Sequence, residues 1–225
     1  MNPAPDRHHA RCYNIYMKLT KFMHACFVVE QADQTIVVDP GEFTADFTMP
    51  DDVSSVVVTH KHSDHISTEL FSDIVRRYAE VKVFTPADND QITSATAMKS
   101  GDSVQVGTVS LEFYGGEHAI IDESIPQIGN LGIMIDELVY YPGDAFVAPD
   151  KPVDTLLLPI AAPWMKISQA MDFVRTLRPR LVIPTHDAIL SEAGQAVGDR
   201  LLGGLCAELD IEYRRLSSGE SIIIE

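Results

Sequence analysis

Short apolar segments separated by polar turns recur along most of this chain. The segments are rich in Val, Ile, Leu and aromatic residues, and Gly, Pro, Asp, Asn or Ser stand between them. Runs of this length and composition are typical of β-strands. The expected strands cover residues 18–22, 26–30, 35–39, 53–59, 81–85, 104–106, 109–114, 131–135, 138–141, 155–159, 181–184, 212–216 and 221–224.

A longer apolar period predicts helices elsewhere. After Ser67, apolar side chains recur at helical spacing up to Tyr78, so they share one face of a helix that Ser67 can cap. Ser168 can cap a second helix, and residues 192–208 are expected to form a third. The first two apolar faces contain Leu70, Phe71, Ile74, Val75 and Tyr78, and Ala170, Phe173, Val174 and Leu177. Many strands with few helices predict an α/β protein in which two sheets pack together and helices cover the outside.

Length and composition favour one folded domain. The chain has 225 residues and is 45% hydrophobic, which is enough for one substantial core. Residues 1–16 combine prolines and paired histidines with few apolar positions, so we expect a flexible leader there. The domain is expected to span residues 17–225. The alternation of apolar segments and polar turns begins at Met17, so it is open whether the native protein carries the leader.

Charge and cysteine content narrow the possible partners. A net charge of -16 offers no basic face for a phosphate backbone, so we expect a small-molecule substrate and no binding to nucleic acid. Cys12, Cys26 and Cys206 are too few and too scattered for a disulfide framework. No apolar run reaches the roughly 18 residues of a membrane helix, and a signal-peptide pattern is missing. We expect a cytoplasmic protein without membrane association, and a homo-oligomer is left open.

The segment from Thr59 to His65 has the composition of a metal site. His60, His62, Asp64 and His65 follow an apolar run directly. In an extended segment side chains alternate, so the first two imidazoles are expected to point one way and Lys61 the other. The adjacent pair Asp64 and His65 diverges from them, which suits a second ion. Imidazole with carboxylate favours zinc, iron or manganese over calcium or magnesium.

Three later residues repeat the same arrangement. His118, Asp144 and His186 each stand just past an expected strand, where loops collect functional groups at one rim of a sheet. Taken singly, each also has a structural interpretation, as a hydrogen-bonded histidine or as an ordinary turn residue. Together with the first segment, they favour a shared metal centre.

These residues resemble the metallo-β-lactamase superfamily, whose signature His-x-His-x-Asp-His is met by His60, His62, Asp64 and His65. The order of the three later ligands also matches, and so does the segment Val37-Val38-Asp39-Pro40-Gly41. Within the superfamily, residues 18–30 are similar to the ascorbate-6-phosphate lactonase-like and phosphodiesterase-like branch. The likeness runs from about Met17 to the C-terminus.

The resemblance implies a four-layered αββα sandwich with a dinuclear metal site. It implies that His60, His62 and His118 hold a first ion, that Asp64, His65 and His186 hold a second, and that Asp144 bridges them. The ions would be zinc, with manganese or iron as alternatives. A hydroxide bridging the ions would attack a small ester-like substrate, either a lactone or a phosphodiester, and Asp64 would donate or shuttle the proton.

Further residues are candidates for supporting roles. His24 would contact the substrate rather than bind metal, whereas Cys26 is more often a buried thiol than a ligand. Trp164 and Lys166 are candidate substrate residues, although packing and solvation are the competing interpretations. Residues that would orient ligands from behind are Asp39, Thr59 and Thr185, and for Asp39 a structural role, capping a turn before Pro40-Gly41, is the competing interpretation. Residues 120–130 would form either a mobile rim around Asp122, Glu123 and Ser124 or an exposed turn.

Two other functions remain compatible with the same ligands. One is an iron-bound redox protein of this fold, which bound iron and a visible absorption band would support. The other is a non-catalytic module that binds or senses metal, which predicts tight binding without turnover.

Overall fold

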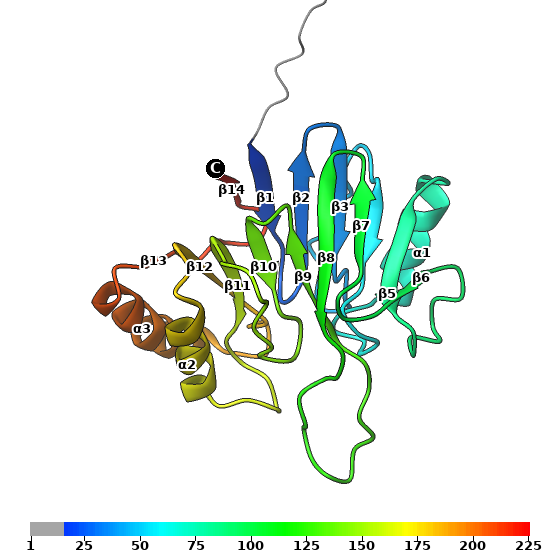
Figure 1. The fold of residues 1–225 in the computed structure, drawn as a ribbon. Helices are drawn as coiled ribbons and strands as arrows, with labels where there is room; N and C mark the ends of the chain where they lie inside the picture. Colours follow the sequence, from blue (N-terminus) through cyan, green and yellow to red (C-terminus); the bar gives the residue numbers. More distant parts are fainter. Residues whose placement is uncertain (1–15) are drawn as a thin grey trace, which may run out of the picture.

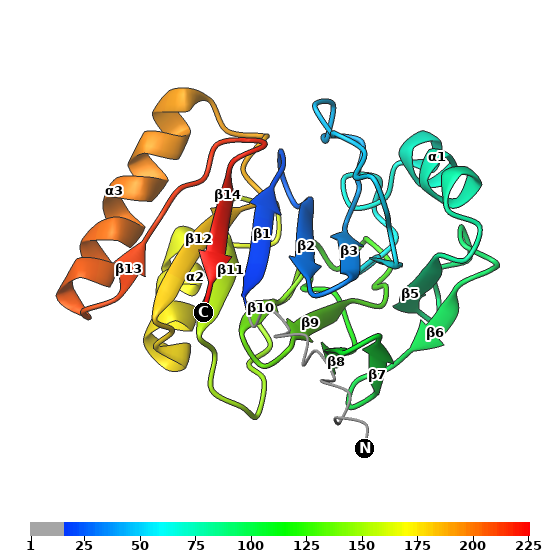
Figure 2. The same ribbon diagram turned by 90° about the horizontal axis from the view of Figure 1, so that it is seen from above.

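Two facing β-sheets form the centre of the computed structural model, which describes residues 16–225 (Figure 1). Each sheet has seven strands, in the orders β14-β1-β2-β3-β4-β5-β6 and β13-β12-β11-β10-β9-β8-β7. Helix α1 lies beside the first sheet, and α2 and α3 lie beside the second (Figure 2). The expected α/β fold, a four-layered αββα sandwich, is therefore confirmed. The leader predicted for residues 1–16 falls, apart from Tyr16, outside the described residues.

The two sheets follow the same pattern of strand directions. From β14 to β3 and from β7 to β10 neighbouring strands are antiparallel, whereas from β3 to β6 and from β10 to β13 they are parallel. The first sheet contains β1 (Met17–Lys21), β2 (Phe27–Gln31), β3 (Gln34–Val38), β4 (Ser55–Val57), β5 (Lys82–Pro86), β6 (Thr96–Met98) and β14 (Ser221–Ile224). The second contains β7 (Ser103–Val106), β8 (Val109–Gly115), β9 (Leu131–Ile135), β10 (Val139–Tyr141), β11 (Thr155–Pro159), β12 (Leu181–Thr185) and β13 (Glu212–Tyr213).

Three apolar layers hold the sandwich together. The central layer lies between the sheets, where side chains such as Leu19, Ile36 and Phe113 are excluded from water. The outer faces of the strands pack against helices, because alternate side chains of a strand point to opposite faces. Ile74 of α1 (Thr68–Arg77) joins the outer layer of the first sheet, and Phe173 of α2 (Ile167–Leu177) joins that of the second. Helix α3 (Glu192–Glu208) adds to the latter layer. Among the described residues no helix has the length and apolar content needed to cross a membrane.

Four local features differ from the sequence-based expectation, the first being strand β13, which covers only two residues of the expected 212–216. Strand β6 was not expected. It lies at the edge of its sheet and buries only Met98 of its three residues, so its sequence contains no apolar run that would indicate a strand. Strand β4 is shorter than the expected 53–59, since the chain leaves the ladder before the histidines. Ser168 does not cap α2, which begins one residue earlier. Lys166 occupies the N-cap, and its backbone N–H donates to Gln169 Oε1 at 2.7 Å.

Candidate metal centre

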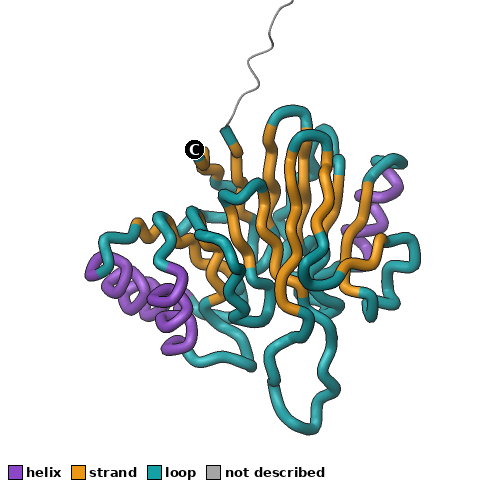
Figure 3. Tube along the Cα trace, in the orientation of Figure 1, coloured by secondary structure: helices purple, strands orange, loops and turns teal. Residues whose placement is uncertain are grey.

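Long loops gather at one edge of the two sheets (Figure 3). The candidate ligands lie in loops that follow strands at this edge. In both sheets the parallel strands run toward this edge, so the loops that follow them start side by side. The residues concerned are His24 after β1, Asp39 after β3, residues 60–65 after β4, His118 after β8, Asp144 after β10, Trp164 after β11 and His186 after β12. The placement at one rim agrees with the expectation from the sequence.

The ligand atoms form two groups. His60, His62 and His118 make up the first group, and His24, Asp64, His65 and His186 make up the second. Within each group the ligand atoms lie within 4.8 Å of one another. The structure thus brings the candidate ligands together in the two sets that the resemblance implies, and it adds His24 to the second set.

Asp144 lies between the two groups. Its Oδ2 is 3.5 Å from Nε2 of His118 and 3.2 Å from Nε2 of His186, while Oδ1 is 3.3 Å from Nε2 of His65. The side chain is almost fully buried. One carboxylate therefore reaches histidines of both groups, which is the position that a bridging ligand requires.

Hydrogen bonds fix the orientation of three of the imidazoles. Nδ1–H of His118 donates to the carbonyl oxygen of Ala119, and Nδ1–H of His186 donates to that of Ala161, each at 2.6 Å. Nδ1 of His65 lies 2.7 Å from Asp39 Oδ2 and donates to it. Because these acceptors take the Nδ1 proton, the neutral rings present an unprotonated Nε2 to the centre.

The inward-facing atoms have no adequate protein partner. His60 Nε2, His118 Nε2 and Asp144 Oδ1 are buried without a hydrogen bond from the described residues. Nε2 of His65 and Nε2 of His186 lie 3.1 Å apart, so two lone pairs would face each other unless a cation or proton stands between them. Buried polar atoms left in this state cost free energy. Nitrogen and carboxylate donors that converge in this way fit divalent zinc, manganese or iron.

The electrostatics of the metal-free centre agree with that fit. Burial lowers the pKa of His60 well below its ordinary value, and it also lowers the pKa of His62, so both rings are neutral. Burial lowers the pKa of His186 as well, but Asp144 and Asp64 outweigh it and raise that pKa to about 9. Asp144 and Asp39 likewise raise the pKa of His65 against the effect of burial. The carboxylates thus favour positive charge in the second group.

His24 does not occupy the position expected for a substrate contact. Its side chain is fully buried, and Nδ1 accepts the N–H of Ala188 at 3.3 Å. The proton therefore lies on Nε2, which donates to Asp64 Oδ2 at 3.1 Å. The backbone of His24 is left-handed, with φ of 59°, an uncommon conformation for a residue with a Cβ. The ring lies behind Asp64, away from solvent, and it orients the carboxylate.

Trp164 has a role that neither sequence interpretation included. Its Nε1–H donates to Asp144 Oδ2 at 2.7 Å, and its ring packs edge-on against Phe146 with centroids 5.0 Å apart. The side chain is buried and so offers no open stacking surface to a substrate. No local sequence pattern indicates this contact, because the partners are 20 residues apart in separate loops. Lys166 is exposed and does not line the cavity described below.

Asp39 and Thr59 contact candidate ligands, whereas Thr185 does not. Both the backbone N–H and the hydroxyl of Thr59 donate to Asp39, at 2.8 and 2.7 Å, and this holds the carboxylate against His65. The hydroxyl of Thr185 is buried without a hydrogen-bond partner among the described residues, so the expectation that it orients a ligand is wrong. Cys26 packs in the outer apolar layer of the first sheet, and burial raises the pKa of its thiol.

Lys61 points away from the ligands, but for a different reason than strand alternation. Residues 60–64 form bends and turns after β4 rather than an extended segment. The ammonium group donates to the carbonyl oxygen of Asp88 at 2.9 Å and lies near the carboxylates of Asp88 and Asp90. Contacts with a neighbouring loop therefore set its direction.

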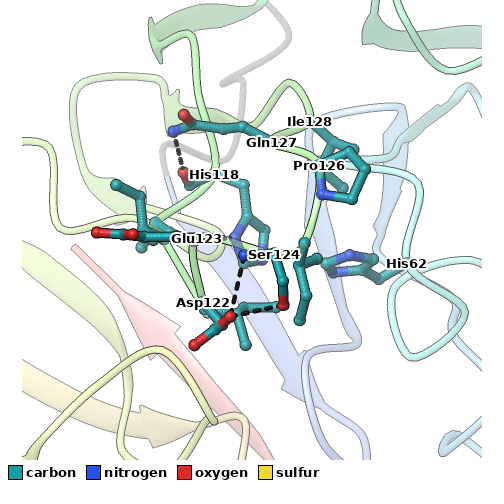
Figure 4. A pocket seen from close by; sticks show the side chains of 12 residues that line it. His62, His118, Asp122, Glu123, Ser124, Pro126, Gln127 and Ile128 are labelled. Atoms are coloured by element: carbon teal, nitrogen blue, oxygen red, sulfur yellow. Dashed lines mark hydrogen bonds between the residues drawn. The ribbon is translucent and has the colours of Figure 1, made fainter.

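A cavity of about 450 Å³ opens beside the first group of histidines (Figure 4). His62 and His118 border it, and residues 119–128 form the rest of its wall. Hydrogen bonds within this segment hold its shape, since Gln127 donates to the carbonyl oxygen of His118 and Asp122 accepts from Ser124. The rim expected at residues 120–130 therefore lies next to the candidate ligands.

Comparison with known proteins identifies the family. Residues 18–186 match the family described as the Beta-lactamase superfamily domain, which accounts for most of the chain. The chain belongs to the metallo-β-lactamase superfamily. Within that superfamily it is similar to Protein Rv0786c of Mycobacterium tuberculosis, with 31% identity over 188 residues that cover 80% of this chain and 89% of that protein.

Other members of the superfamily are named as hydrolases. A UPF0173 metal-dependent hydrolase of Desulforamulus reducens is 28% identical over 76% of this chain and 84% of its own length. Among solved structures, Igni18, a metallo hydrolase from the archaeon Ignicoccus hospitalis, superposes with a TM-score of 0.71 and 26% identity. The superposition covers 93% of this chain and 99% of that one. These relatives and the clustered His and Asp side chains support a metal-dependent hydrolase of the superfamily.

Proposed function

We propose that this protein is a dinuclear metal-dependent hydrolase that cleaves a small ester-like bond, in a lactone or a phosphodiester. His60, His62 and His118 would hold one ion, Asp64, His65 and His186 the other, and Asp144 would contact both. The observation that carries the proposal is the position of Asp144, whose carboxylate lies within 3.5 Å of histidines from both groups. In a purely structural cluster of histidines, a buried central carboxylate would be expected to have hydrogen bonds to both of its oxygens. Oδ1 of Asp144 has none from the described residues.

Two divalent ions bound there would supply a hydroxide nucleophile near neutral pH and would polarise the oxygen of the scissile bond. Zinc suits the donor set, and manganese and iron are the alternatives. The protein provides the orientation of the donors. Asp39 and the carbonyl groups of Ala119 and Ala161 keep the Nδ1 protons on the outer side of three imidazoles.

Asp64 is the candidate for proton transfer. Its side chain is 24% exposed, compared with 4% for Asp144, so it is the more accessible of the two carboxylates. His24 donates a hydrogen bond to Oδ2 and keeps the carboxylate in place. In this position Asp64 can take a proton from the attacking water and pass it to the leaving group. His24 acts through Asp64 and is a positioning residue.

The test is elemental analysis of untagged protein purified without added metal, together with hydrolysis assays on a lactone and on a bis-aryl phosphodiester. We expect about two zinc or manganese ions per chain, with turnover that chelation removes and metal restores. Bound iron with a visible band and no hydrolysis would indicate redox chemistry instead. Tight metal binding without turnover on either substrate would indicate a binding or sensing module.

A further inference from the structure

The geometry points to an uncharged carboxylic ester or lactone with an apolar substituent as the substrate of this site. This inference rests on the proposed hydrolase function and specifies its substrate class. Phosphodiesters are excluded by it, and so are lactones that carry a phosphate group.

The wall of the cavity is apolar where a substituent would lie. Beyond His62 and His118, its lining includes Ile120, Ile121, Ile125, Pro126 and Ile128. Ile120 is 66% exposed and Ile125 is 47% exposed, although both are large apolar side chains. Apolar side chains gathered around a cavity of this size are typical of sites for small molecules. A hydrocarbon chain or ring in contact with them would remove this surface from water.

Apolar exposure continues on other loops that carry site residues. Met23 precedes His24, and Ile189 follows His186 by three positions, and both are exposed. Phe43 is 42% exposed, and its ring makes a T-shaped contact with the His24 ring, with centroids 5.0 Å apart. The loops around the two groups of ligands therefore present apolar tips to solvent.

The charge of the lining opposes an anionic substrate. Among residues 16–225 neither lysine nor arginine lines the cavity, and its charged side chains other than the histidines are Asp122 and Glu123. Lys61, the basic residue within the histidine segment, is held by the Asp88 loop. Proteins usually bind phosphate groups with Arg, Lys or backbone N–H groups, whereas two carboxylates here would repel one. A neutral substrate meets no such repulsion.

The reaction itself is simple hydrolysis. The oxygen of water bonds to the acyl carbon, the bond from that carbon to the ester oxygen breaks, and the proton of the water passes to the departing oxygen through Asp64. An ester gives a carboxylic acid and an alcohol, and a lactone gives a hydroxy acid. The step requires neither an oxidant nor a reductant.

The test uses the metal-loaded full-length protein and 4-nitrophenyl esters that differ only in the acyl group. The acetate measures hydrolysis of an ester with a minimal acyl group. The hexanoate measures the effect of contact between an alkyl chain and the apolar wall, and the glutarate monoester measures the effect of a negative charge on an acyl chain of similar length. We expect kcat/KM to rise about tenfold or more from acetate to hexanoate, since each buried methylene contributes up to about 0.8 kcal/mol. The glutarate ester and bis(4-nitrophenyl) phosphate should fall below the acetate.

Two double variants and one control variant locate these preferences. The double variant Ile120→Ser, Ile125→Ser should reduce the ratio of hexanoate to acetate kcat/KM several-fold. Val197→Ser, which changes an exposed apolar residue on α3, should leave that ratio unchanged. The double variant Asp122→Lys, Glu123→Lys should raise kcat/KM for the glutarate ester relative to the hexanoate.

The possible failures are distinguishable. Equal kcat/KM for acetate, hexanoate and glutarate would overturn the inference while the hydrolase stands. Turnover of the phosphodiester in preference to all carboxylic esters would do the same. Metal-loaded protein without turnover on any of these substrates would refute the proposed function and the inference with it.

Discussion

At the residue scale, Trp164 illustrates how a side chain outside the histidine motif contributes to the centre. Its indole N–H donates a hydrogen bond to Asp144 Oδ2, and its ring packs against the ring of Phe146. Without this hydrogen bond, the buried carboxylate, which lies within 3.5 Å of three imidazoles, would be free to rotate toward one group. We therefore assign to Trp164 the orientation of Asp144 rather than a contact with substrate.

Trp164→Phe should weaken metal binding while the fold is kept. The variant retains an aromatic ring in the same apolar surroundings but loses the N–H donor, and loss of such a supporting contact typically lowers metal affinity by about 10–100-fold. Competition with a chromophoric chelator measures the affinity, and circular dichroism checks the fold. Phe146→Leu is the matched control, because it disturbs the same packing without removing the hydrogen bond to Asp144. Equal loss of affinity in both variants would show that packing, not the hydrogen bond, matters.

A second pair of variants separates the ligands of the histidine segment from their neighbour. His62→Ala should lose one ion per chain and most hydrolytic activity, because it removes a nitrogen donor of the first group. Lys61→Ala should keep both ions, because its ammonium group contacts the Asp88 loop. Elemental analysis and ester hydrolysis of the two proteins provide the measurement. Full metal content in His62→Ala would contradict the assignment of the first group.

At the element scale, the parallel strands determine where the chemistry lies. The strands β3, β4, β10, β11 and β12 end at the same rim, so the short loops after them bring residues together from distant parts of the sequence. The helices stabilise the outer faces of the sheets and contribute no candidate ligand. Changes to a helix are therefore expected to alter stability more than metal content.

The capping of α1 and α2 provides a test at this scale. Ser67 Oγ accepts the N–H of Leu70, so Ser67→Ala should lower the free energy of unfolding by about 1 kcal/mol. Ser168→Ala should change it by less than about 0.5 kcal/mol, because Ser168 lies inside the first turn of α2 and does not cap it. Urea denaturation of the metal-loaded variants measures both values. A larger effect for Ser168→Ala would contradict the observed start of α2.

At the scale of the whole molecule, the buried histidines link stability to pH. In the metal-free protein the pKa of His186 is about 9, above its ordinary value, and the pKa of His65 is raised as well. The folded state therefore holds more protons than the unfolded state above pH 6.5, so stability is lost as pH rises from about 6.5 to 9. The folded state lowers the pKa values of three other histidines, His60, His62 and His24. Below pH 6.5 these rings take up protons more readily in the unfolded state, so stability is lost as the pH falls.

We therefore expect the melting temperature of the metal-free protein to have a maximum near pH 6.5. Metal binding requires deprotonated ligands, so the metal-loaded protein should keep or gain thermal stability between pH 6.5 and 9. Differential scanning calorimetry of both forms across this range makes the comparison. Parallel pH profiles for the two forms would mean that His65 and His186 are not metal ligands.

The sequence by itself determined most of the strands and the identity of the candidate ligands. Strand periodicity is local, because alternation of buried and exposed side chains follows from the backbone of each segment. Residues 60–65 are adjacent in the chain, so their proximity needs no knowledge of the fold. Strand β6 was missed because an edge strand with exposed residues has a weak pattern.

Only the tertiary structure decided which side chains support the ligands and what surrounds them. The contact of His24 with Asp64 joins residues 40 positions apart, and Trp164 meets Asp144 across two loops. Such pairs depend on which strand ends lie side by side in a sheet, and this is set by long-range packing rather than by local periodicity. The same packing places the apolar 119–128 segment beside His62, and thereby determines the cavity.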